Sequence, residues 1–304
     1  MEFEALNDVK DTDTICPIHK KALVTFGSAS PFCIDCRKQE LKAKEQQLAK
    51  AGKQRYDRRR TIETLEKDSI VGDRSLWQSS FDNYQPDSLE SSTALTDARL
   101  FAEEYIEALS NLGRKKKELT LAQEKNGFQS AEAIEIQNQL LKLDRQTAFN
   151  VIFSGVPGVG KSHLGMSILK YVNENADPLV SCLFISVNDL MRMIKDSITN
   201  KQSRYTEENM IRALSKADLL VLDDLGSESS FRKKETSESS EYNQRVLFSI
   251  LNSRTRTIIT TNLSSRELEE IYNPKIVSRI YRGVEGHIIK FTKVTKDKRS
   301  KINF

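Results

Sequence analysis

The segment NVIFSGVPGVGKS, residues 150–162, decides the fold of this chain. It opens with a short apolar strand, and a helical pattern over residues 162–174 follows its last residue. Between the two lies G-x-x-x-x-G-K-S, a loop whose backbone N–H groups can converge on phosphate oxygens at the start of a helix. We expect ATP to be bound by Gly155, Val156, Pro157, Gly158, Val159, Gly160, Lys161 and Ser162.

A nucleotide site also needs an acidic segment outside the loop, which helps to bind Mg²⁺ and to activate water. Lys161 would reach the β- and γ-phosphates, and Ser162 would coordinate Mg²⁺. The apolar run 219–222 is followed by Asp223 and Asp224, about 62 residues after the lysine. We expect Asp223 to hold Mg²⁺ through water, and Asp224 to orient or deprotonate the attacking water.

Two later segments complete the predicted catalytic set. The apolar strand 257–261 ends at Asn262, which could contact the γ-phosphate or the attacking water. Arg279 lies in the apolar helical run 276–280 and suits a finger that reaches the γ-phosphate of a neighbouring subunit. A surface salt bridge is the alternative interpretation of Arg279.

Strands and helices alternate from residue 148 onward. Such alternation predicts an α/β fold with a parallel sheet covered on both faces. The Ser/Glu/Lys-rich run 227–240 interrupts the alternation and is typical of a mobile loop. The expected strands are 150–153, 179–187, 219–222 and 256–261, and the expected helices are 162–174, 188–198 and 241–253.

Composition limits the class of protein. The 304 residues carry a formal net charge of +4, with 38% hydrophobic and 30% charged residues, which excludes wholesale disorder. No apolar run approaches the ~18 residues of a membrane span, and the acidic start lacks a signal-peptide core. We therefore expect about two domains in a cytoplasmic protein with no membrane partner.

Four potential metal ligands stand near the N-terminus. Cys16-x₂-His19 and Cys33-x₂-Cys36 are two pairs separated by 13 residues, and such a set suits tetrahedral Zn²⁺. Unrelated reduced thiols are the alternative. About 40 residues cannot build a core alone, so a bound metal would carry the folding. Cys182 lies in a predicted strand and is interpreted as a buried hydrophobe.

A basic helix and a helical insertion separate the two groups of motifs. Residues 37–60 contain ten Lys/Arg and three acids, a net charge of +7, and predict a solvated helix with a thin apolar seam. A helix is expected over 93–112, and 113–146 reads as a helical insertion with a break near Gly127. The predicted division is a zinc-binding domain (1–40), a basic helix and linker (41–72), a connector with the insertion (73–147) and an ATPase domain (148–304).

Several short motifs together resemble the AAA+ ATPases of the DnaC/DnaI helicase-loader clade, which also includes IstB-like transposition ATPases. The motifs are Phe81-Asp82-Asn83-Tyr84, Lys161-Ser162-His163-Leu164, Asp223-Asp224-Leu225-Gly226, Thr260-Thr261-Asn262-Leu263, Ser278-Arg279 and Asp297-Lys298-Arg299. The resemblance covers residues 75–304 except the insertion. It implies an AAA+ core with a reduced lid, and it adds His163 and Arg299 to the nucleotide site.

The resemblance also implies partners. Members of this clade deliver a hexameric replicative helicase onto single-stranded DNA under ATP control, and they associate through bound nucleotide. Single-stranded DNA would be contacted by the helix 188–198 and by Arg232, Lys233, Lys234 and Tyr242. The cysteine and histidine cluster is similar to the zinc-binding domain with which DnaI-type loaders engage the helicase, and such a cluster is equally compatible with binding of nucleic acid. Two alternatives stay open: a transposition ATPase that assembles on DNA and recruits a transposase, and an ATP-binding adaptor with little turnover.

Overall fold

The computed structural model describes residues 9–200, 202–229 and 237–298, and the chain forms two compact units. The smaller unit ends at Arg58, and the larger one begins at Arg59. The predicted Arg232, Lys233, Lys234 and Arg299 lie outside the described residues.

The smaller unit consists of a β-hairpin and nearly all of a long helix. Strand β1 (Val9–Ile15) pairs antiparallel with β2 (Ala22–Phe26), and α1 (Ile34–Arg60) follows. Among its described residues, the buried side chains are those of Cys16, Val24 and Cys33. Two of these three are predicted metal ligands, so the unit has almost no apolar core of its own.

Helix α1 confirms the predicted solvated helix. It begins at Ile34, three residues before the basic window, and it buries no side chain. Leu41 and Leu48 are 50% and 68% exposed. The two leucines of the thin apolar seam are therefore not buried by any of the residues that the structure describes.

The larger unit is built on a five-stranded, all-parallel sheet in the order β4-β5-β6-β3-β7. This confirms the predicted α/β fold. The strands are β3 (Asn150–Gly155), β4 (Cys182–Ser186), β5 (Leu219–Leu225), β6 (Thr257–Thr261) and β7 (Ile288–Phe291). Because the strands are parallel, the carboxyl ends of β3, β5 and β6 lie at one edge of the sheet, where the predicted nucleotide residues follow them.

Helices cover both faces of this sheet, as alternate side chains of the strands require. In β5, Leu219 and Val221 pack with α2, α3 and α5, whereas Leu220 and Leu222 pack with α6 to α10. The helices of the two layers are α2 (Ile62–Asp68), α3 (Leu89–Asn126), α5 (Lys161–Asn175), α6 (Val187–Thr199), α7 (Glu207–Lys216), α8 (Ser237–Asn252), α9 (Ser265–Ile271) and α10 (Pro274–Ile280), with short 3₁₀ turns η2 (Arg74–Gln78) and η3 (Ser227–Ser229).

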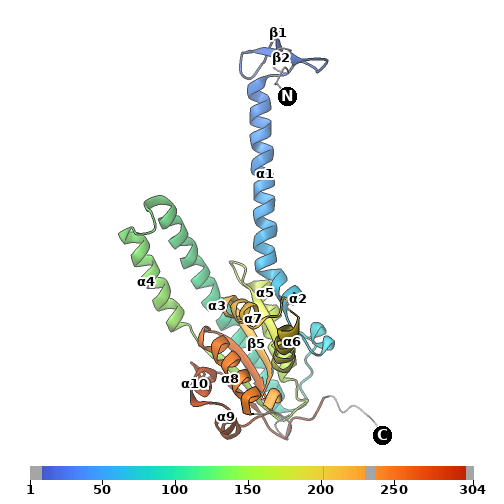
Figure 1. Ribbon diagram of the computed structural model, residues 1–304, viewed down its shortest axis with the longest axis vertical. Coiled ribbons are helices and arrows are strands. Elements are labelled where there is room, and N and C mark those ends of the chain that lie inside the picture. Colours follow the sequence, from blue (N-terminus) through green and yellow to red (C-terminus); the bar gives the residue numbers. More distant parts are fainter. Residues whose placement is uncertain (1–8, 201, 230–236, 299–304) are drawn as a thin grey trace. The chain divides into compact units, whose positions relative to one another are not determined.

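The predicted insertion forms a helical hairpin with the end of α3. Helix α3 runs without interruption to Asn126, and α4 (Ala131–Gln146) returns alongside it after the break at Gly127 (Figure 1). The first half of α3 buries Ala98, Ala102 and Tyr105 against the sheet. The connector predicted over 73–147 thus supplies one of the layers of the larger unit.

Other segment boundaries also differ from the sequence-based expectation. The strand expected over 179–187 is confined to β4. At its start, the Asp218 carboxylate accepts hydrogen bonds from the backbone N–H and the hydroxyl of Ser181. At its end, Ser186 is the N-cap of α6. Strand β7 and helices α7 and α9 were not expected. The run 227–240, expected to be a mobile loop, contains η3 and the start of α8.

Within the described parts of the chain, no helix is both long enough and apolar enough to span a bilayer.

Candidate nucleotide site and metal cluster

The phosphate loop joins β3 to α5. Gly155 has a φ of +126°, and a Cβ there would lie 2.0 Å from the carbonyl oxygen of Phe291 on β7. Gly160 precedes α5 with a φ of +97°. A side chain at Gly155 would clash with β7, and one at Gly160 would meet the Tyr84 ring, so both glycines of the pattern are required by their neighbours and by their positive φ.

Lys161 is 7% exposed, and its ammonium group donates three hydrogen bonds. The acceptors are the carbonyls of Gly155 (2.8 Å) and Val156 (2.7 Å) and Oδ1 of Asn262 (2.8 Å). The structure therefore joins the lysine of the loop to the polar residue predicted after β6. At this position the Lys161 ammonium can also donate hydrogen bonds to the phosphate oxygens of a nucleotide.

Asp223 is the buried acid at the end of β5. Thr260 on β6 donates its hydroxyl proton to Asp223 Oδ1 at 2.7 Å, and the Ser162 hydroxyl also bonds to this carboxyl group. Burial raises the pKa of Asp223, and these two hydrogen bonds oppose the shift. A divalent cation nearby would stabilise the ionised form of this buried carboxyl group. The oxygen ligands offered by Ser162 and Asp223 suit Mg²⁺.

Asp224 has a φ of +58°, in the left-handed region that few side chains other than Asn and Asp tolerate. Its backbone N–H donates to the Thr260 hydroxyl oxygen at 2.8 Å, and its Oδ1 accepts from Asn262 Nδ2 at 2.9 Å. Thr260 therefore bridges both acids. Lys161, Asn262 and Asp224 form one continuous hydrogen-bonded chain across three strand ends.

Tyr84 was quoted in the sequence motif but not expected in the site. Its hydroxyl donates to the Val159 carbonyl at 3.2 Å, and its ring meets His163 edge-on at 5.3 Å. The His163 ring nitrogen Nε2 lies 2.9 Å from the carbonyl oxygen of Ser80, and burial lowers the pKa of this histidine. His163 thus packs the loop against the segment before α3.

The C-terminal segment also lies on the loop. The backbone N–H of Lys298 donates to the Gly158 carbonyl at 2.9 Å, and its ammonium lies 3.5 Å above the Tyr84 ring. A Cβ on Gly158 would lie 1.9 Å from a carboxylate oxygen of Asp297. Contacts between positions so far apart in sequence carry no local signal, which explains why the sequence did not predict them.

Arg279 and Tyr242 contact residues outside the hydrogen-bonded chain of Lys161, Asn262 and Asp224. The Arg279 guanidinium donates to Asn252 Oδ1 at 3.1 Å and lies 5.9 Å from the Phe248 ring. Tyr242 donates its hydroxyl proton to Glu207 at 2.8 Å. Burial and this carboxylate raise the pKa of Tyr242 to about 12. The finger and DNA-binding roles of these two residues stay predictions.

Glu228 is a buried acid that sequence reasoning missed. One carboxylate oxygen accepts the Gly226 backbone N–H at 2.9 Å, and the other accepts the Tyr272 hydroxyl. Its exposure is 5%, and burial raises its pKa. The carboxylate links the turn after β5 to Tyr272, the residue that follows α9. Its position two residues after a glycine in a strand-end motif was the only available signal.

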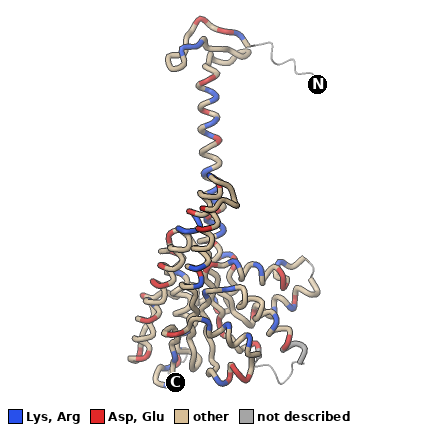
Figure 2. Tube along the Cα trace, turned by 90° about the vertical axis from the view of Figure 1, so that its left-hand side faces the viewer, with Lys and Arg blue, Asp and Glu red and all other residues tan. Residues whose placement is uncertain are grey.

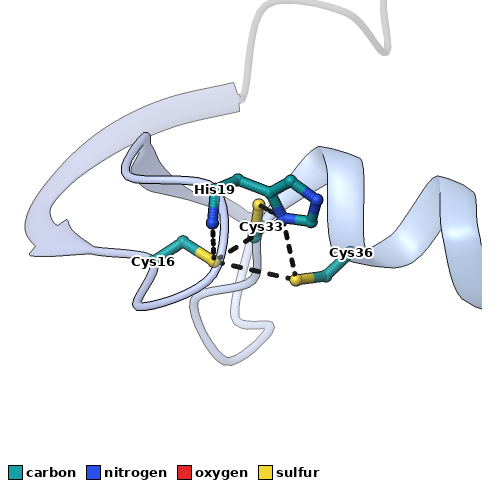
Figure 3. Close-up of side chains that lie close together, drawn as sticks. All are labelled: Cys16, His19, Cys33 and Cys36. Carbon is teal, nitrogen blue, oxygen red and sulfur yellow. Dashed lines mark hydrogen bonds between the residues drawn. The ribbon is translucent and has the colours of Figure 1, made fainter.

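The four predicted metal ligands converge in the smaller unit. Cys16 and His19 come from the turn after β1, and Cys33 and Cys36 from the start of α1 (Figure 3). Their ligand atoms all lie within 4.8 Å of one another. The structure thus brings together the two pairs that the spacing singled out.

The separations fit a tetrahedral ion. With Zn–S near 2.3 Å and Zn–N near 2.05 Å, the edges of a tetrahedron are about 3.8 Å for S···S and about 3.5 Å for S···N. The Sγ atoms of Cys16 and Cys36 are 3.7 Å apart, and His19 Nδ1 lies 3.3 Å and 3.6 Å from those of Cys36 and Cys33. The His19 backbone N–H, 3.5 Å from the Cys16 sulfur, lowers the pKa of that thiol to about 6, whereas burial and the neighbouring thiols raise the pKa of Cys36 to about 12. A bound metal requires the thiolate form of each cysteine ligand.

A phosphate loop after the first strand of a parallel sheet, with a buried acid on the next strand but one, defines a P-loop ATP-binding domain of the AAA+ class. The chain belongs to the family of IstB-like ATP-binding proteins, which matches residues 98–280. The predicted AAA+ fold and family are both confirmed.

Curated relatives carry the name "Replicative helicase loader DnaC". The protein of Buchnera aphidicola subsp. Acyrthosiphon pisum is 29% identical over 154 residues, 48% of this chain and 59% of that protein. The protein of Escherichia coli K12 is 32% identical over 136 residues, 43% of this chain and 50% of that protein. The chain thus spans about half the length of the curated relatives it matches.

Solved structures of similar arrangement are described as the DnaC helicase loader and DnaI. The DnaC structure is 21% identical with a TM-score of 0.47, and the match covers 72% of this chain and 99% of that chain. The DnaI structure is 18% identical with a TM-score of 0.45, and the match covers 76% of this chain and 96% of that chain.

Proposed function

We propose that this chain is an ATP-dependent loader that binds a hexameric replicative DNA helicase and delivers it onto single-stranded DNA. The observation that carries the proposal is the identity of 29–32% to proteins named replicative helicase loaders. The Cys₃His cluster supports it further, because a small metal-held unit outside the ATPase domain suits docking to a partner.

The proposal includes slow ATP hydrolysis, and the contacts at the strand ends support it. Bound Mg²⁺, held by Ser162 and Asp223, supplies charge neutralisation at the phosphates. Lys161 binds phosphate oxygens. Asp224 orients the attacking water and accepts its proton, and Asn262 fixes the carboxylate of Asp224 through the 2.9 Å hydrogen bond.

The same proposal assigns the remaining predicted residues. Arg279 reaches the γ-phosphate of a neighbouring subunit in a nucleotide-bridged assembly. Arg232, Lys233, Lys234 and Tyr242 contact single-stranded DNA, and Arg299 contacts the nucleotide. Zn²⁺ bound by Cys16, His19, Cys33 and Cys36 folds the smaller unit, because the metal-binding free energy replaces the missing apolar core.

The test is capture of a helicase by the full chain. The parent should retain a hexameric replicative helicase on an affinity resin and contain one zinc ion per chain. Cys33→Ser should lose both zinc and helicase. The matched control is Asp35→Asn, which breaks the 2.6 Å ion pair with Lys21 beside the cluster but removes no ligand. The control should keep both.

Two outcomes would contradict the proposal. If Cys33→Ser loses zinc but captures the helicase as well as the parent does, the metal unit is not the docking site. If the parent ignores the helicase and retains a transposase instead, the loader function is wrong. The second result would support the transposition ATPase, which the match to IstB-like proteins keeps as the other candidate.

A further inference from the structure

Helix α1 carries a local excess of positive charge, and part of that charge has no partner among the described residues. Residues 37–60 hold a net charge of +7 in a chain whose net charge is +4, so all other residues together carry −3. Figure 2 shows Lys and Arg recurring along the whole helix. A charge so concentrated on one exposed element indicates a polyanionic partner.

Five cations of α1 are exposed and have neither a hydrogen-bonded nor an electrostatic partner among the described residues, whereas Lys38 acts on the Asp35 carboxylate. Other cations of the helix are already occupied, for example Arg37 with Glu40 and Arg59 with Asp68. The five are Lys42, Lys44, Lys50, Lys53 and Arg55. Five unpaired cations within 14 residues repel one another, so an anion bound along the helix is favoured electrostatically.

The arrangement of these cations around the helix axis decides between partners. At about 100° per residue, Lys42, Lys50 and Lys53 fall within about 80° of one another, whereas Lys44 and Arg55 point to the opposite side. A folded acidic protein would meet one side of an exposed helix at a time, whereas the major groove of a duplex can admit a helix and present phosphates on both of its walls. A flexible single strand can turn around the helix and reach both sides.

The apolar content of α1 argues against a protein partner. Its exposed large hydrophobic residues are Leu41, Leu48 and Tyr56, beside Ile34 at its start. A stable protein interface buries ~800 Å² on each partner around an apolar centre, which two leucines one heptad apart cannot supply. Phosphate binding needs no such centre.

We propose that α1 is a sequence-independent binding surface for single-stranded DNA that works without nucleotide. It is distinct from the segments of the larger unit to which DNA contact was assigned above, and it does not depend on the loader function. Its five cations would contact backbone phosphates, and binding would be driven largely by the release of counterions.

The test measures binding of fluorescein-labelled dT20 to the full chain by anisotropy, without ATP, between 50 and 200 mM salt. About five phosphate contacts predict a slope of about −3.5 for log K against log salt, or a loss of roughly 100-fold in affinity over this range. Replacing Lys42, Lys44, Lys50, Lys53 and Arg55 together by Gln should bring the slope near zero. Gln has a helix propensity close to that of Lys and Arg, so helicity measured by circular dichroism should not change.

A second variant removes the same charge elsewhere. Arg74, Lys117, Lys125, Lys142 and Arg145 are exposed, and replacing all five by Gln also lowers the net charge by five. This control should bind dT20 as the parent does. Equal loss in both variants would show that only net charge matters, and no loss in the α1 variant would place binding elsewhere.

Two competitors complete the test. A 20-base-pair duplex and poly-glutamate of equal total charge should each displace dT20 at least ten times less well than unlabelled dT20 does. If the duplex competes equally, the proposal that α1 is a surface for single-stranded DNA is wrong. If poly-glutamate competes equally, the surface is one for acidic protein, and the proposal is overturned.

Discussion

Replacing Thr260 by Val should destabilise the larger unit in a way that depends on pH. Thr260 is 1% exposed and bridges Asp223 and Asp224, the two acids near the end of β5. Valine keeps the shape but removes the donor to Asp223 and the acceptor for the Asp224 N–H. A lost hydrogen bond to a buried carboxylate costs about 1.5–3 kcal/mol and an unsatisfied N–H about 1 kcal/mol, so we expect a loss of roughly 2–4 kcal/mol.

The pH dependence follows from Asp223. Because its pKa in the folded protein is raised above its ordinary value of 3.8, its protonated form favours folding at low pH, and this contribution is lost as the pH rises through the folded-state pKa. Thr260→Val removes a hydrogen bond that holds this pKa down. The difference in free energy of unfolding between variant and parent should therefore be larger at pH 7 than at pH 5.

Urea titrations at both pH values measure the effect, and Thr257→Val is the matched control. Thr257 lies on the same strand and is also 1% exposed, but its hydroxyl accepts only a long 3.4 Å bond from Arg254. We expect the control to lose about 1 kcal/mol or less at either pH. Equal losses in the two variants, or a loss for Thr260→Val that does not change with pH, would refute the bridging role.

Three further changes test other parts of the site. Glu228→Gln removes a carboxyl whose raised pKa stabilises the fold only at low pH, so unfolding free energies in urea should fall less for this variant than for the parent between pH 5 and pH 8. Gly158→Ala and Gly286→Ala both place alanine at a φ of +81°, at a cost of about 1–2 kcal/mol each, but only the first pushes a Cβ against a carboxylate. Calorimetry should show weaker ATP binding for Gly158→Ala and unchanged binding for Gly286→Ala. Arg279→Ala and Lys161→Ala should each lack ATPase activity and recover part of it when mixed, and a mixture that assembles but stays inactive would indicate a purely local role for the arginine.

The sequence predicted those parts of the site in which chemistry demands a residue type at a fixed spacing. The phosphate loop, the acid pair near the end of β5 and the Cys₃His cluster are of this kind. It also predicted the strand–helix alternation, because buried parallel strands must be apolar on both faces. Asn262 was predicted because it directly follows an apolar strand.

The remaining parts depend on contacts between distant segments. Strand β7 is four residues long and includes Lys290, so its pattern is weak, and its place is set by pairing with β3. Glu228 lies in a Ser/Glu-rich run typical of a loop, yet Tyr272, 44 residues later, buries it. Lys298 reaches the phosphate loop only because the chain returns there after β7. None of these contacts has a local periodicity.

The packing of Tyr84 and Lys298 on the phosphate loop determines where an expression fragment of the ATPase domain can begin and end. An ATPase fragment that starts at residue 148 would omit Tyr84 and the first half of α3, and would expose the apolar face of the sheet that Ala98 and Tyr105 cover. Such a fragment would tend to aggregate whatever its intrinsic activity. An expression fragment should instead start at the boundary near Arg59 and extend past Lys298, so that both segments that pack on the loop are translated with it.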